Sequence, residues 1–111
     1  MLAAILLMAA APADARPTSE GALNGWFNCV GNAADRFAIE STETADVIAQ
    51  GALGVCGSKE VAYWVALYDE LREGSTGLQD TKTVFDLHKQ RAYQIAVAKV
   101  LIARSTKKTT P

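Results

Sequence analysis

Apolar residues recur at intervals of three and four along most of this chain, which is the spacing of one face of an α-helix. The first such stripe begins at Leu23 and continues through Trp26, Phe27, Val30, Ala34 and Phe37. Polar residues occupy the positions between them, so the pattern predicts an amphipathic helix with one solvated face. Either Ser19 or Asn24 could cap its N-terminus.

A polar segment, Ser41 to Thr44, interrupts the stripe and predicts the start of a second helix. Serine and threonine hydroxyls satisfy the free N–H groups of a first turn, and Glu43 and Asp46 place negative charge at its positive end. We expect one long helix from about Thr44 to Glu73. Because Gly51, Gly54 and Gly57 weaken a helix, a break near residues 54–58 is the alternative.

The predicted second helix carries apolar residues on two sides. One face contains Ala45, Ile48, Ala52, Val55 and Cys56, and the opposite face contains Val61, Trp64, Val65, Tyr68 and Leu71. A helix that is apolar on two sides is usually central, so we expect this helix to lie between the other two.

The segment from Glu73 to Gly77 predicts a stop, with Gly74 placed to end the second helix. A third helix is expected from Asp80 or Thr81 to about Arg104. Its stripe contains Val84, His88, Ala92, Ile95, Lys99 and Ile102. The fold class predicted is therefore all-α, a three-helix antiparallel arrangement with a long middle helix that either runs straight or kinks.

The N-terminus has the layout of a secretory signal peptide. An unbroken apolar run from Leu2 to Ala11 precedes two small-x-small sites, which place cleavage after Ala13 or after Ala15. The run is shorter than the roughly 20 residues needed to span a bilayer, so we expect no integral membrane span after cleavage. The predicted organisation is a signal peptide over 1–15, a mobile mature N-terminus over 16–22, a helical domain over 23–105 and a disordered tail over 106–111.

Export changes the interpretation of Cys29 and Cys56, the only two cysteines. Cysteines in an oxidising compartment usually pair. Cys29 lies about as far before the turn near Ser41 as Cys56 lies after it, so in an antiparallel hairpin they reach nearly the same height. We therefore predict a Cys29–Cys56 disulfide between the two helices. Their separation of 27 positions argues against a redox pair of the Cys-x-x-Cys kind.

Length and charge exclude several functions. A chain of 111 residues holds one domain at most. The formal net charge is −1, and loss of Asp14 with the signal leaves equal numbers of acidic and basic residues, so no global field favours nucleic acid. We expect no nucleic-acid partner.

The residues offer little material for catalysis or metal binding. His88 is the only histidine, and two cysteines with one distant histidine give no recognised zinc spacing. A cluster of acids, Asp69, Glu70 and Glu73, is typical of a solvated helix surface. We expect no enzyme activity, no cofactor and no metal. The candidate partner surface is aromatic and consists of Tyr63, Trp64 and Tyr68.

The segments around the cysteines resemble a group of small exported helical proteins of alphaproteobacteria that are functionally uncharacterised. The resemblance rests on W-x-x-C (Trp26, Cys29), on S-T-E-x-A (Ser41 to Ala45) and on I-A-x-x-A-L-x-x-C (Ile48 to Cys56). A weaker similarity, to exported lysozyme inhibitors of the LprI type, rests on Cys56, Glu60, Tyr68 and Leu71, and this chain lacks the further cysteines of that group.

These observations lead to one functional expectation and one alternative. We expect a periplasmic or secreted, non-enzymatic structural or protein-interaction domain that binds an envelope or extracellular protein or associates with itself. The alternative, implied by the weaker similarity, is an inhibitor of a cell-wall hydrolase such as lysozyme.

Overall fold

The computed structural model describes residues 18–72 and 77–109, and this part of the chain is all-α, as predicted. Its helices are α2 (Ser19–Glu40), α3 (Ala45–Val55), α4 (Gly57–Leu71) and α5 (Gly77–Thr109). The prediction of three helices is wrong, because two helices stand where one long middle helix was expected. The predicted signal peptide, Gly74 and the last two residues of the predicted tail lie outside the described residues.

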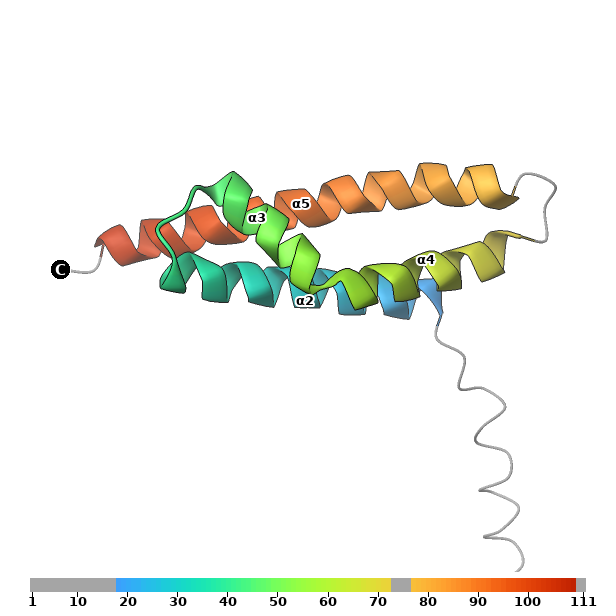
Figure 1. Ribbon diagram of the computed structural model, residues 1–111, viewed down its shortest axis with the longest axis horizontal. Helices are drawn as coiled ribbons and strands as arrows, with labels where there is room; N and C mark the ends of the chain where they lie inside the picture. The colour runs from blue at the N-terminus through green and yellow to red at the C-terminus, as the bar shows by residue number, and fades with distance from the viewer. Residues whose placement is uncertain (1–17, 73–76, 110–111) are drawn as a thin grey trace, which may run out of the picture.

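The helices form a bundle in which α2 and α5 lie side by side and run in the same direction (Figure 1). Helix α4 runs antiparallel to both, and α3 crosses them obliquely before joining α4. Both α3 and α4 contact α2 as well as α5. The middle segment therefore covers the α2–α5 pair, and the expectation that it separates the first helix from the last is wrong.

The break between α3 and α4 falls at Cys56. Its backbone N–H still donates to the carbonyl of Ala52, at 3.2 Å, and its carbonyl accepts from the N–H of Glu60, at 3.1 Å. Gly54 and Gly57 flank this residue, and each glycine costs up to about 1 kcal/mol of helix propensity relative to alanine. The chain thus bends at its weakest helical point, within residues 54–58, where a break was the predicted alternative to a straight helix.

Helix α4 buries a different face from the one predicted. Val61 and Val65 are 62% and 50% exposed, whereas Tyr63 and Leu67 are buried at 1% and 6%. The rotation of α4 is fixed by Tyr63, whose ring stacks against Trp26 of α2. Periodicity alone could not decide between the two faces, because both carry apolar residues.

Threonine side chains cap the N-termini of α2 and α3. Thr44 Oγ1 accepts a hydrogen bond from the N–H of Val47, at 3.3 Å, which confirms the predicted helix start. Thr18 Oγ1 accepts from the N–H of Gly21, at 3.0 Å. Helix α2 consequently begins at Ser19, earlier than the predicted Leu23, and neither Ser19 nor Asn24 is its cap.

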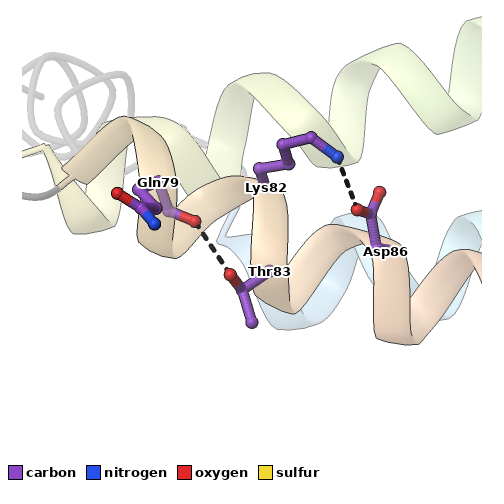
Figure 2. A network of polar contacts seen from close by, with 4 residues as sticks. All are labelled: Gln79, Lys82, Thr83 and Asp86. Carbon is purple, nitrogen blue, oxygen red and sulfur yellow. Dashed lines mark hydrogen bonds and ion pairs between the residues drawn. The ribbon is translucent and has the colours of Figure 1, made fainter.

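Helix α5 is longer than expected, because it starts at Gly77 and runs to Thr109. Its first turns carry side-chain contacts between residues four positions apart, of which the Lys82–Asp86 ion pair is the kind that supports an exposed helix segment. Figure 2 shows two of them: Thr83 Oγ1 donates to the Gln79 carbonyl at 3.1 Å, and Lys82 Nζ lies 2.8 Å from Asp86 Oδ2. The helix start also packs tightly against the end of α4, since a Cβ at Gly77 would lie 2.6 Å from the Cα of Arg72.

The core is built mainly from small residues around the buried rings of Trp26 and Tyr63. The larger buried aliphatic side chains are Ile48, Leu67, Val30 and Val100. Alanines fill most of the remaining interhelical positions: Ala33, Ala34, Ala38, Ala49, Ala52, Ala66, Ala92 and Ala96. Small side chains let helices approach closely, so the packing of this domain depends strongly on a few larger residues.

Candidate functional site

A disulfide joins Cys29 in the middle of α2 to Cys56 at the α3–α4 break, which confirms the predicted pairing. The Cα atoms lie 6.0 Å apart, within the range found for disulfides. Cys56 is fully buried. The bond fixes the bend against α2, so it acts as a structural cross-link of the bundle.

Six rings from three helices form an aromatic cluster close to this disulfide, and we use that name for Trp26, Phe27, Tyr63, Trp64, Phe85 and His88. The Trp26 ring is nearly parallel to that of Phe85, with centroids 5.6 Å apart. Tyr63 stacks on the same tryptophan at 5.8 Å, and Trp64 meets Phe85 edge-on at 5.1 Å. Aromatic pairs of this geometry each add about 0.5–1.5 kcal/mol beyond their burial. The cluster holds α2, α4 and α5 together.

His88 belongs to this cluster through one short hydrogen bond. Its Nδ1 lies 2.6 Å from the hydroxyl oxygen of Tyr63. Its ring also meets the ring of Phe27 edge-on. Since both cysteines are bound in the disulfide, the structure forms no Cys–His nucleophilic pair. His88 connects α5 to α4 as a packing residue.

Among the described residues, Trp26 Nε1 is the one buried side-chain polar atom without a hydrogen-bond partner. It is buried, and no hydrogen-bond acceptor reaches it among the described residues. A buried N–H without a partner costs about 1–3 kcal/mol. The cluster therefore contains a destabilising group that the surrounding ring packing has to outweigh.

The aromatic residues expected to form a partner surface separate in the structure. Tyr63 is buried at 1%, so it cannot belong to such a surface. Trp64 is partly buried against Phe85. Only Tyr68 is exposed, at 37%.

A different apolar surface lies on the outward side of α4, and we call Val61, Val65 and Tyr68 the α4 outer stripe. These residues follow a spacing of four and three, so they share one helix face. All three are exposed. From the sequence, Val61 and Val65 were expected to pack against a neighbouring helix, and Tyr68 was also a candidate for the partner surface.

Two concave regions flank α3. The first, which we call the α2–α3 groove, has a volume of about 320 Å³ and lies between the C-terminal end of α2 and α3. It is lined by Phe37, Glu40, Ser41, Glu43, Val47, Ile48 and Gly51. The second, which we call the α3–α4 notch, has a volume of about 380 Å³ and is lined by Gln50, Leu53, Gly54, Gly57, Glu60, Val61 and Lys89. Each draws residues from at least two helices, which is why sequence reasoning missed both.

The acidic residues near the end of α4 have structural partners. A carboxylate oxygen of Glu70 accepts from the backbone N–H of Ser19 at 3.2 Å, at the positive end of α2. Asp69 Oδ1 lies 3.9 Å from Arg72 Nε, and Glu73 lies outside the described residues.

Within residues 18–72 and 77–109, no group of three or more histidine, cysteine or carboxylate side chains could hold a metal ion. None of the described helices is long and apolar enough to cross a membrane.

Two tyrosines have a raised pKa. Burial is the main cause at Tyr63, and the negative charge of Glu70 adds to it. The hydrogen bond that Tyr93 donates to Asp46 is the main cause at Tyr93, followed by desolvation and by the charge of Asp46. In both cases the neutral phenol is favoured in the folded protein.

We expect the free energy of unfolding to fall as the pH rises above about 10, the ordinary pKa of tyrosine. Because the pKa of each phenol is raised by folding, the unfolded chain loses the two phenol protons at a lower pH than the folded protein does. The stability that these phenols contribute is therefore fully present below a pH of about 10 and is lost as the pH rises through their folded-state pKa. Urea midpoints measured from neutral to alkaline pH check this. Tyr63→Phe and Tyr93→Phe should each flatten the decline relative to the parent protein. An alkaline profile that is the same in the parent and in both variants would contradict the assignment.

No protein-family model, no curated protein and no solved structure matches this chain.

Proposed function

We propose that this chain is an exported, disulfide-stabilised domain that binds another protein and has no catalytic role. The observation that carries the proposal is the α4 outer stripe. Three large side chains are exposed side by side on a helix whose opposite face is fully used by the core. Contiguous exposed apolar surface on a small protein marks an interaction site.

The disulfide supports an oxidising location for this domain. Cys29 and Cys56 are paired, and disulfides persist mainly outside the cytosol. The apolar run and the small-x-small sites at the N-terminus are the sequence signals that agree with export to the periplasm or beyond.

A photo-cross-linker placed on α4 tests the interaction. We expect a benzophenone side chain at position 65, in the centre of the stripe, to give one discrete cross-linked product with another protein when the chain is expressed in its own host. Position 82 is the matched control, since Lys82 is a solvated residue near the start of α5. Equal labelling at both positions, or none at position 65, would contradict the proposal.

The alternative function is inhibition of a cell-wall hydrolase such as lysozyme. It predicts a one-to-one complex with the hydrolase and slower clearing of a cell-wall suspension. An interaction domain of another kind leaves that rate unchanged, so the turbidity assay separates the two functions.

A further inference from the structure

Five uncharged residues share the outermost line of α5, on the side that faces away from the other helices. We call them the α5 outer stripe, and they are Leu87, Gln90, Gln94, Ala98 and Leu101. Their spacing of three and four places them on one helix face. All five are exposed, the two leucines at 63% and 58%, whereas Ala92, Ala96 and Val100 on the opposite face are fully buried. The described part of the chain therefore leaves this stripe uncovered.

The charged side chains of the same helix segment lie off the stripe. Lys89 Nζ lies 3.0 Å from a carboxylate oxygen of Glu60 of α4. Lys99 Nζ lies 3.7 Å from a carboxylate oxygen of Asp35 of α2. The outward face of a surface helix ordinarily carries charged and polar residues. A neutral line flanked by charges is instead the composition of an interface centre, where charged residues are depleted. The α5 outer stripe is therefore suited to contact with protein.

The spacing of the stripe is symmetric about Gln94, because the steps from Leu87 to Leu101 are three, four, four and three residues. An antiparallel second copy, related by a two-fold axis at Gln94, would place Leu87 opposite Leu101 of the other copy. The long side chain of Gln90 would lie opposite the short one of Ala98. A two-fold interface requires a surface that is complementary to itself, and this stripe has that property.

The residues on either side of the stripe agree with the antiparallel direction. One turn beyond the leucines, Thr83 and Ser105 are equally far from Gln94, so two small hydroxyl side chains would meet at each end. A parallel partner would instead place Gln90 opposite Gln90 and Ala98 opposite Ala98, which crowds one position and leaves a gap at the other. The partial charges of the helix ends also attract one another in the antiparallel direction and repel in the parallel one.

We propose that a second copy of this chain covers the α5 outer stripe and forms an antiparallel dimer with a two-fold axis at Gln94. The two Gln94 side chains meet at this axis, where each amide both donates and accepts a hydrogen bond, and a polar pair of this kind fixes the register of two helices. From Thr83 to Ser105 the contact is about 33 Å long at 1.5 Å per residue. A single helix face of this length is at the low end of specific interfaces, which begin at about 1,200 Å² in total, so the dimer is weak and reversible. It uses α5 and not the α4 outer stripe, so it is independent of the proposed function.

Analytical ultracentrifugation of the disulfide-bonded mature protein tests the dimer. Over concentrations from about 10 μM to about 1 mM, the weight-average mass should rise from that of one chain towards that of two. Leu87→Glu should raise the dissociation constant at least tenfold, because the two-fold axis introduces the carboxylate twice. Leu78→Glu is the matched control, since Leu78 is a leucine of the same helix that is exposed to the same extent, 64%, and lies off the stripe. It should dimerise as the parent protein does.

Cysteine cross-linking tests the direction of the two helices. Both native cysteines are bound in the disulfide, so an added cysteine is the only free thiol. A mixture of the single variants Leu87→Cys and Leu101→Cys, treated with a short bismaleimide, should give a cross-linked dimer that contains one chain of each. Leu87→Cys alone should give none, because the two added thiols would lie about 21 Å apart along the helix axes at 1.5 Å per residue.

Several outcomes would overturn the inference. The protein would have to remain a monomer at all concentrations, form larger oligomers, or form a dimer that Leu87→Glu and Leu78→Glu weaken equally. Cross-linking of Leu87→Cys with itself would show that the two helices are parallel and would reject the two-fold axis proposed at Gln94. None of these results bears on the cross-linker at position 65, which reports on a different helix, so the dimer and the proposed function can fail separately.

Discussion

Replacing Trp26 by alanine is expected to lower the free energy of unfolding by about 3–5 kcal/mol, the usual cost of removing a buried aromatic side chain. Trp26 is fully buried and stacks against rings from both α4 and α5. The alanines around it cannot fill the cavity. Small domains have a total stability of about 5–15 kcal/mol, so the variant should be close to unfolding at room temperature. Urea denaturation followed by circular dichroism measures the change.

Two further variants make this result specific. Trp64→Ala removes a ring that is only partly buried, and its cost should be clearly smaller. Trp26→Phe should also cost less than Trp26→Ala, because it retains a ring and removes the buried Nε1 that has no partner. If Trp64→Ala destabilised the protein as much as Trp26→Ala, the central role of Trp26 would be wrong.

Removing the disulfide is expected to cost about 3.5 kcal/mol, the loss of unfolded-state entropy for a closed loop of this size. The double variant Cys29→Ala, Cys56→Ala removes the bond without leaving a free thiol in the core. For a domain of this size a change of 1 kcal/mol corresponds to about 4–8 °C, so the melting temperature should fall by about 15 °C or more. Thermal unfolding followed by circular dichroism gives the value.

The parent protein under reducing conditions is the control for this variant. A reductant should lower the melting temperature of the parent towards that of the double variant and should leave the double variant unchanged. The intact mass of the exported parent should match a chain that begins at Asp14 or Arg16 and should be two hydrogens lighter than that of the dithiol form. A full-length species with free thiols would contradict both export and the disulfide. A double variant with the same melting curve as the parent would show that the disulfide does not contribute to stability.

The parts of the fold that the sequence predicted are the ones decided locally. Thr44 caps α3 because its hydroxyl reaches an N–H three residues away, and that signal is complete within the segment. The cysteine pairing could be predicted because two helices of known rise about a known turn place both residues at the same height.

The errors come from contacts between distant segments. Val61 and Val65 have the same helical spacing as core residues, but Tyr63 determines which face of α4 is buried, through Trp26 and His88. The start of α5 was misplaced for a similar reason, since the close approach of Gly77 to Arg72 depends on how α4 and α5 meet.

The candidate site was harder to predict than the fold. Phe37 and Val47 appeared in the sequence as members of separate helices, and Glu40 and Glu43 as polar residues at a helix boundary. They form one concave surface only because α3 crosses α2 at an angle, which follows from the bend at Cys56. The spacing of apolar residues within α2 or within α3 does not predict the angle at which the two helices cross.

The parallel course of α2 and α5 gives the molecule a polarity. Helix α2 begins towards one end of the bundle, and α5 ends at the other (Figure 1). The α2–α3 groove lies at the C-terminal end of α2, about 30 Å from Ser19 at 1.5 Å per residue. A copy tethered to a surface through its N-terminus would therefore hold the groove out at the distal end, accessible to a second surface. Tethering through the C-terminus would bring the groove close to the attachment point.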